Sequence, residues 1–196
     1  MAKVNIKGPI VSDNDARIYE WLGIKATCPK IVNDAIDKAN GEDLEVIINS
    51  GGGSVFAASE IYTALKSYMG NVTVKIVGMA ASAASVIAMA GKKVMMTPTG
   101  QMMIHNVTTY AEGDYRDMEH TADILKTAND TIANAYRLKS GKTQEELLAL
   151  MDDETWMDAK KAKELGLIDE IMFEDVQLAA SAGYSGLLPP EVNLQE

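Results

Sequence analysis

Two units of apolar strand, glycine-containing turn and helix follow each other between residues 44 and 90, and they constrain the fold more than any other feature. The first unit has a predicted strand over 44–48 and a helix over 57–69. The second has a strand over 72–77 and a helix over 82–90. Repeated units of this kind form a largely parallel sheet with helices outside it. The sequence therefore predicts an α/β protein.

The turn of the second unit carries a serine at its apex. Residues 78–85 read GMAASAAS and lie between the strand and the helix. Such a turn exposes the hydroxyl of Ser82 and leaves the first N–H groups of the helix unpaired. Those groups and the helix dipole favour an oxyanion that develops beside the serine. The pattern indicates a nucleophile, although Ala/Ser/Gly segments also occur where helices pack closely.

The turn of the first unit contains three consecutive glycines, Gly51 to Gly53. Glycines permit positive φ angles and a close approach of ligand to backbone. Their N–H groups can therefore face a cleft as oxyanion donors or peptide-binding donors. A flexible strand–helix turn is the alternative. The spacing matches neither the dinucleotide motif G-x-G-x-x-G nor the P-loop.

Of the two histidines, His105 is the candidate base because it follows an apolar strand-like run over 101–104. A histidine at a strand end can take a proton from a serine, and a hydrogen-bonded structural histidine is the alternative. His120 lies in a polar helical stretch, and we expect it on the surface. An acid would orient the imidazole. The candidates are three adjacent carboxylates that we expect to be partly buried between two helices: Asp152, Asp153 and Glu154.

With these motifs, the chain resembles the Clp-type serine peptidases, the proteolytic subunits of ATP-dependent Clp proteases, and especially their phage-associated relatives. The resemblance runs from about residue 44 to 171. Two departures are a glycine at 51, where the family usually has proline, and a glutamate at 154, where it usually has aspartate. The segments that carry the resemblance are 49–53, 61–62, 78–82, 103–105, 154–159 and 166–169.

The resemblance implies a crotonase-like fold of repeated β-α units with a protruding long handle helix. It implies a catalytic triad of Ser82, His105 and Glu154 in the family's order along the chain. Asp153 is the alternative acid. The function that it implies is a serine endopeptidase that cleaves peptides or unfolded proteins inside an oligomeric chamber.

The same resemblance places the oxyanion hole at the backbone N–H groups of Gly53 and Ala83, with Gly52 and Gly53 binding substrate. It implies no cofactor and no metal, and the sequence has no Cys/His cluster with metal-ligand spacing. Two other classes stay open. A crotonase-type acyl-CoA enzyme could use similar turns, although no basic cluster for the CoA phosphates is seen. An inactive structural homologue would need neither nucleophile nor base.

A long helix is predicted over 114–139, with an apolar stripe interrupted by Asn129. At ~1.5 Å per residue it would reach roughly 40 Å, which exceeds a small core. The resemblance implies a handle that joins subunits of a homo-oligomer, a ring with stacked heptamers as one form; a long surface helix is the alternative. The stripe consists of Tyr115, Met118, Ala122, Leu125, Ile132 and Tyr136.

Shorter elements are predicted on either side of these units. The sequence predicts a capping box at Thr143 and a helix cap at Asp158. The single cysteine, Cys28, excludes an internal disulfide, and we interpret it as structural. Further predicted elements are a strand over 4–10, a helix over 29–39, and strands over 93–97 and 101–104.

Length and charge set the remaining expectations. The 196 residues suit one peptidase domain over 1–175 and a loosely ordered tail over 176–196. A net charge of −10 argues against nucleic acid as the main partner. No apolar run is long enough to span a bilayer and no signal peptide is seen, so we expect no membrane partner and a cytoplasmic location. Residues 1–10 leave little room for the axial loop through which the family docks an AAA+ unfoldase, so we expect activity without one.

Overall fold

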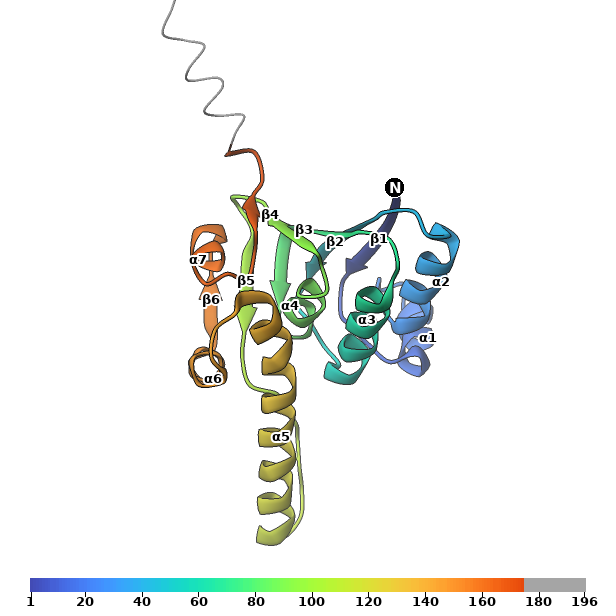
Figure 1. Ribbon diagram of the computed structural model, residues 1–196. Helices are drawn as coiled ribbons and strands as arrows, with labels where there is room; N and C mark the ends of the chain where they lie inside the picture. Colours follow the sequence, from blue (N-terminus) through green and yellow to red (C-terminus); the bar gives the residue numbers. More distant parts are fainter. Residues whose placement is uncertain (175–196) are drawn as a thin grey trace, which may run out of the picture.

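The computed structural model describes residues 1–174 (Figure 1), and the tail predicted over 176–196 lies outside them. The helices expected over 29–39 and 114–139 form almost as predicted. In chain order the elements are β1 (Ala2–Lys7), α1 (Asp13–Trp21), α2 (Pro29–Ala39), β2 (Leu44–Ser50), α3 (Val55–Ser67), β3 (Val72–Ala81), α4 (Ala83–Ala88), β4 (Lys93–Met96), β5 (Gln101–Ile104), α5 (Tyr115–Ser140), α6 (Gln144–Asp152), β6 (Thr155–Met157), α7 (Ala159–Glu164) and β7 (Glu170–Ile171).

The sheet is parallel along its main path, β1-β2-β3-β4-β7. Its longest strand, β3, has two successive neighbours on one side. Residues 73–76 pair with β4, and residues 79–81 pair with β5, both in parallel. Among the described strands, β6 alone runs antiparallel, against β5. The predicted α/β class with a largely parallel sheet is confirmed, and the carboxyl ends of β3 and β5 meet at one edge.

Helix α4 lies in the middle of the core, and all six of its residues are buried. Its sequence, AASVIA, is apolar apart from Ser85, as expected for a helix surrounded by protein on every side. Small side chains let neighbouring elements approach its backbone closely. The small-residue segment that follows β3 therefore serves packing as well as the turn.

Helix α5 projects from the body of the molecule (Figure 1). It begins with a capping box between Asp114 and Asp117, and it ends at Gly141 in the left-handed region. Only its base contributes buried residues: Ala133, Ala135 and Tyr136. Asn129, the polar interruption of the predicted stripe, accepts a 2.7 Å hydrogen bond from the N–H of Val107. The polar residue thus fastens the extended segment after β5 to the helix.

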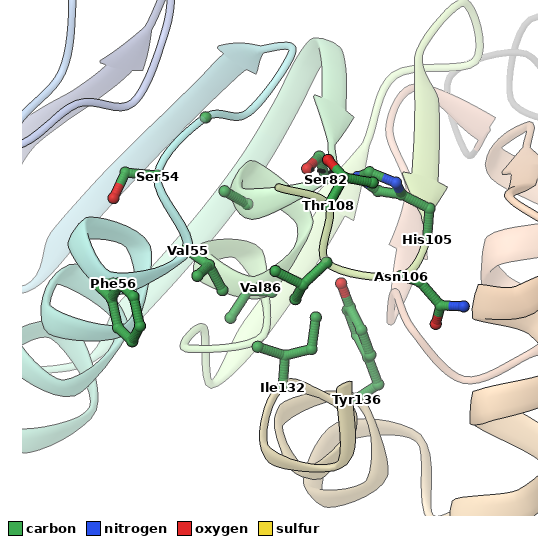
Figure 2. A pocket seen from close by; sticks show the side chains of 13 residues that line it. Ser54, Val55, Phe56, Ser82, Val86, His105, Asn106, Thr108, Ile132 and Tyr136 are labelled. Carbon is green, nitrogen blue, oxygen red and sulfur yellow. Dashed lines mark hydrogen bonds between the residues drawn. The ribbon is translucent and has the colours of Figure 1, made fainter. Parts of the chain in front are cut away.

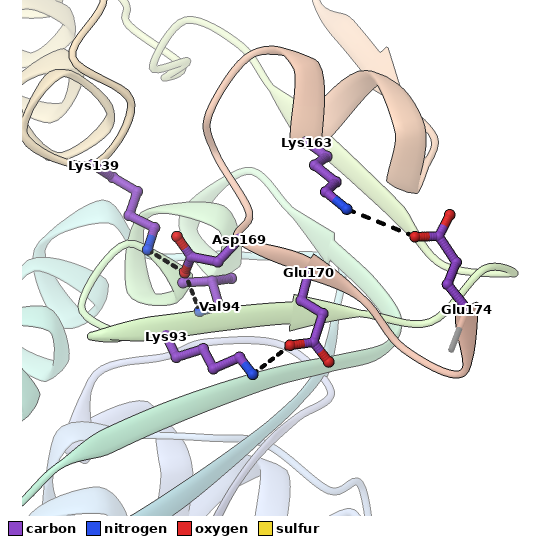
Figure 3. Close-up of polar contacts among 7 residues, drawn as sticks. All are labelled: Lys93, Val94, Lys139, Lys163, Asp169, Glu170 and Glu174. Atoms are coloured by element: carbon purple, nitrogen blue, oxygen red, sulfur yellow. Dashed lines mark hydrogen bonds and ion pairs between the residues drawn. The ribbon is translucent and has the colours of Figure 1, made fainter. Parts of the chain in front are cut away.

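Strand β7 is fastened to the sheet and to the base of α5 by the motif Gly166-Leu167-Ile168-Asp169 (Figure 3). The Asp169 carboxylate accepts from the N–H of Val94 at 2.6 Å and from the Lys139 ammonium at 2.5 Å. Leu167 and Ile168 are buried beside it. The motif therefore has a structural explanation that does not depend on catalysis.

The sequence patterns did not predict α1, β6 or β7. Helix α1 buries none of its nine residues, and its apolar side chains Ile18 and Trp21 are exposed. Ile18 and Trp21 are spaced as on one helical face, but that face covers no part of the core in residues 1–174. The strand predicted over 4–10 ends at Lys7, because Gly8 turns the chain with φ 70°. None of the helices in residues 1–174 is both long enough and apolar enough to cross a bilayer.

Candidate active site

Ser82 stands at the point where β3 ends and α4 begins, with φ 53° and ψ −128°. Few non-glycine residues adopt this region, and such outliers occur at catalytic turns. Its N–H donates to the Met103 carbonyl at 2.9 Å, which ties the turn to β5. The side chain does not cap α4. The hydroxyl is therefore presented away from the helix and is free to meet a partner.

That partner is His105, which follows the last residue of β5 (Figure 2). Its Nε2 lies 2.8 Å from Ser82 Oγ. Because β5 pairs in parallel with the end of β3, the two side chains emerge at the same edge of the sheet. With Nε2 unprotonated, the serine hydroxyl donates to the ring, and this is the geometry that a general base requires.

The acidic segment adjoins the histidine through the β5–β6 pairing. Ile104 faces Thr155, so continuing the antiparallel register places His105 opposite Glu154. Glu154 has φ 46° and accepts from the indole N–H of Trp156 at 3.3 Å. Within residues 1–174, no hydrogen bond joins Glu154 to His105.

The two aspartates lie beside this pair. Asp152 accepts from the Asn106 side-chain amide at 2.7 Å, and Asp153 caps the carboxyl end of α6. The expectation that the three carboxylates are partly buried was wrong, because all three are exposed. The chain reverses direction between α6 and β6 at the surface, so these side chains extend into solvent.

The glycine turn packs directly against the nucleophile. Gly52 has φ 97°, and a Cβ there would lie 2.7 Å from both the Ala81 carbonyl and Ser82 Cβ. Gly53 has φ 146°, and a Cβ there would meet the Ile10 carbonyl at 2.1 Å. Any larger residue would push the two turns apart. The structure thus gives a steric reason for glycine at both positions.

Among residues 1–174, no group accepts a hydrogen bond from the Gly53 N–H, so this N–H can meet a ligand. Ile10 donates to the Gly52 carbonyl at 2.9 Å and accepts from the Ser54 N–H at 2.8 Å. In such a parallel bridge the central residue, Gly53, directs its own N–H to the opposite side. Ala83 is the first residue of α4, so its N–H has no partner within the helix. Both donors border the same cavity.

That cavity has a volume of about 320 Å³ and opens beside Ser82 and His105 (Figure 2). Polar backbone from the glycine turn and the start of α4 forms one side. Much of the remaining lining is apolar, although Ser54, Asn106 and Thr108 also contribute; the apolar part consists of Val55, Phe56, Val86, Val107 and Ile132, with the ring of Tyr136. A cavity of this size and polarity accommodates one apolar side chain of a peptide next to a reacting carbonyl. Within residues 1–174, no cluster of His, Cys, Asp or Glu side chains has the geometry of a metal site.

Tyr136 lies elsewhere than the sequence predicted. The apolar stripe placed it between subunits, but it is buried within its own chain, 1% exposed, beneath the nucleophile. Its hydroxyl lies 2.8 Å from Ser85 Oγ. His120 is on the surface, as expected. In the sequence, only Ser85, the second serine of residues 78–85, indicated that a polar contact could form at this place.

Comparison with known proteins agrees with the fold. A model of the Clp protease family matches residues 31–175. The ATP-dependent Clp protease proteolytic subunit of Bacteroides fragilis is 35% identical over 143 residues, which are 72% of this chain and 68% of that protein. The subunit of Deinococcus radiodurans is 33% identical over 140 residues, 70% of this chain and 69% of the relative. That of Porphyromonas gingivalis is 36% identical over 143 residues, 70% and 63%.

The fold and these matches define the class of protein, a serine peptidase on a largely parallel sheet. The chain belongs to the Clp protease family. It spans about two thirds of the length of these relatives, with shares of 63%, 68% and 69%.

Proposed function

We propose that the protein is a serine endopeptidase with Ser82 as nucleophile, His105 as general base and Glu154 as the orienting acid. The observation that supports this most directly is the 2.8 Å contact between Ser82 Oγ and His105 Nε2 at a strained strand-to-helix turn. The cavity beside the pair and the two free N–H groups at its edge fit a peptide carbonyl.

In the first half of the reaction, Ser82 Oγ attacks the carbonyl carbon of the scissile bond and His105 Nε2 takes the hydroxyl proton. The oxyanion of the tetrahedral intermediate accepts hydrogen bonds from the N–H groups of Gly53 and Ala83. The C–N bond then breaks, and His105 gives its proton to the leaving amine. In the second half, water attacks the acyl-enzyme while His105 takes a proton from it. His105 then gives that proton to Ser82 Oγ as the ester C–O bond breaks, and the new carboxylate is released.

Glu154 is proposed as the acid because the β5–β6 register sets it opposite His105. Its present contact with Trp156 is long, at 3.3 Å, and exposed, so its loss costs little. A rotation of the side chain toward His105 Nδ1 would then complete the triad. Catalytic hydrogen bonds often become short only when substrate is bound.

A homo-oligomer is proposed from the outer half of α5. That half carries exposed apolar side chains, with Tyr115 68% and Ile124 53% exposed, on an arm that extends from the core. Burying them against another subunit would remove apolar surface from water. A ring, with stacked heptamers as one form, would enclose the site in a chamber.

The substrates proposed are short peptides or unfolded proteins, and the setting is a cytoplasm, with a phage head protein during maturation as one target. The support is the resemblance of the site motifs to phage-associated relatives. The relatives are named ATP-dependent, and the partner that would hydrolyse ATP is an AAA+ unfoldase. We propose that this chain cleaves short or unfolded substrates without one. The test measures degradation of casein and of a folded, tagged protein, each with and without an unfoldase and ATP. Unaided cleavage predicts that casein is degraded without ATP, whereas degradation of the folded protein only with the unfoldase and ATP would indicate the partnered role.

The nucleophile is tested with a fluorophosphonate probe and a fluorogenic peptide. The wild-type chain should be labelled once, at Ser82, and Ser82→Ala should lose both labelling and cleavage while remaining folded. Ser67→Ala, at the exposed end of α3, is the matched control and should behave as wild type. Unlabelled wild-type protein would instead favour an inactive homologue or an acyl-CoA enzyme.

A further inference from the structure

A buried hydrogen-bonded relay lies beneath the nucleophile. Ser85 is 0% exposed and Tyr136 is 1% exposed. Ser85 Oγ lies 2.6 Å from the Ser82 carbonyl and 2.8 Å from the Tyr136 hydroxyl. None of the proposed catalytic steps uses either hydroxyl. Each is nevertheless within two hydrogen bonds of the reacting serine.

The direction of the relay follows from counting protons. A serine hydroxyl has one proton, and Ser85 must donate it to the Ser82 carbonyl, because a carbonyl can only accept. The Tyr136 hydroxyl must therefore donate to Ser85 Oγ. Burial raises the pKa of Tyr136 well above its ordinary value, so its proton stays in place at any working pH.

The relay acts on a peptide group of the oxyanion hole. The Ser82 carbonyl and the Ala83 N–H belong to one peptide unit, which is planar and trans, so the two bonds point in opposite directions. The carbonyl accepts from Ser85 Oγ at 2.6 Å and from the Ser85 N–H at 2.9 Å. Holding the oxygen on the core side therefore aims the N–H at the cavity. Hydrogen bonds at a carbonyl also polarise the N–H of the same unit.

We infer that Tyr136 and Ser85 are positioning residues that aim the Ala83 N–H at the oxyanion. The inference rests on the proposed function, because it assigns a role within the same site. Packing alone does not account for the pair, since an alanine and a phenylalanine would fill nearly the same space without two polar groups to desolvate. The relay also joins α5 to the nucleophile turn, because Tyr136 stands at the base of that helix.

The decisive variant is the double substitution Ser85→Ala/Tyr136→Phe, because it removes both hydroxyls and leaves neither one buried without a partner. The single variants Ser85→Ala and Tyr136→Phe complete a double-mutant cycle. Tyr68→Phe is the control, since its hydroxyl also donates to a backbone carbonyl, that of Glu42, far from the site. The measurements are kcat and KM for a fluorogenic peptide, per site titrated with fluorophosphonate. A peptide aldehyde, whose hemiacetal oxygen occupies the oxyanion position, reports on the hole itself.

The double variant should retain wild-type thermal stability within a few degrees. Its kcat should fall about tenfold, less than the loss of an oxyanion donor itself, with KM within about twofold. The inhibition constant of the aldehyde should rise by a similar factor. Each single variant should lose no less than the double, because both act through one relay.

Wild-type kcat and aldehyde affinity in the double variant would overturn the inference, and so would a rise in KM with kcat unchanged. If a single variant fails to fold, the double variant and the control still decide. Ser82→Ala is measured in parallel, so that activity persisting in it counts against the proposed function and not against the relay.

Discussion

At the scale of single residues, Ser82 keeps a left-handed backbone angle because bonds on both sides hold it. Its N–H is fixed to the Met103 carbonyl, its own carbonyl to Ser85, and Gly52 packs against its Cβ. Such a conformation costs of order 1–3 kcal/mol, and the surrounding structure has to offset that cost. The strain presents the hydroxyl to His105 and places the Ala83 N–H beside it.

Gly52→Ala tests this packing. The substitution should abolish cleavage and lower the free energy of unfolding by more than the cost of a positive φ angle, because the new methyl would overlap the Ala81 carbonyl and Ser82 Cβ at 2.7 Å. Gly41→Ala is the control: Gly41 has φ 85° with nothing within 4 Å of an added Cβ, so it should cost only about 1 kcal/mol and leave activity intact. Urea unfolding and peptide cleavage measure both. Equal stability losses in the two variants would contradict the steric argument.

Glu154→Gln tests the acid. Loss of the orienting carboxylate should lower kcat by on the order of 10³ to 10⁴ with little change in KM, since the amide favours the wrong tautomer of His105. Asp152→Asn and Asp153→Asn are the controls, because each makes the same change from carboxylate to amide at a neighbouring position. Their kcat should stay within about tenfold of the wild-type value. A full loss in Asp153→Asn, with Glu154→Gln nearly as active as wild type, would assign the acid to the neighbouring position.

At the scale of elements, α5 has two halves with different environments. The base is buried through Ala133, Ala135 and Tyr136, while residues 115–120 are exposed throughout. Within residues 1–174, the apolar side chains of the outer half therefore have no neighbours that bury them fully. The element is stable as an arm because its capping box and its left-handed Gly141 close both ends.

Met118→Glu/Ile124→Glu tests the arm as an interface. Both side chains are exposed, 38% and 53%, so the folded monomer should persist with an unchanged circular dichroism spectrum. The native mass should fall to that of smaller species because charges would be buried between subunits. Lys126→Glu, also exposed on α5, is the control for added negative charge. A wild-type protein that sediments as one chain at micromolar concentration would contradict the assembly.

Sequence reasoning succeeded where an element buries a periodic face or carries a cap, as α2, α5 and the Thr143 capping box show. It missed α1 because that helix buries no residue, and β7 because two residues carry no pattern. It identified Ser82 and His105 separately, each after a predicted strand, and the resemblance to the Clp peptidases implied that they pair, as the 2.8 Å contact shows. It could not place Tyr136 correctly, because a stripe does not reveal which half of a long helix meets its own core.

At the scale of the whole molecule, a charge cluster connects the first three strands of the sheet. Glu45 on β2 is paired with Lys75 on β3 and with Lys3 on β1. The Lys75 ammonium beside it lowers the pKa of Glu45 below its ordinary value of 4.5. Because the folded pKa is the lower one, this pairing stabilises the fold above about pH 4.5, and the contribution disappears as the pH falls through the folded pKa.

Glu45→Gln should therefore destabilise the protein at pH 7 and have less effect at pH 3, because pH 3 lies below the ordinary pKa of 4.5 and part of the contribution of the pairing is lost there. The free energy of unfolding in urea at pH 3, 5 and 7 measures the difference. Glu42→Gln is the control and should change stability little at each pH, because within residues 1–174 this exposed carboxylate pairs only with the N-terminus. A Glu45→Gln effect that is independent of pH would point to packing instead of charge.

The hydrogen bonds of the site join residues that are far apart in the chain, and this has a consequence for biosynthesis. Ile10 holds the glycine turn, Ser82 follows 72 residues later, and its base and its buried support lie at 105 and 136. A growing chain therefore exposes the nucleophile before the residues that activate it have been made. When it is first synthesised, this serine is therefore an unactivated alcohol. It becomes reactive only when β5 and the base of α5 have folded against the nucleophile turn.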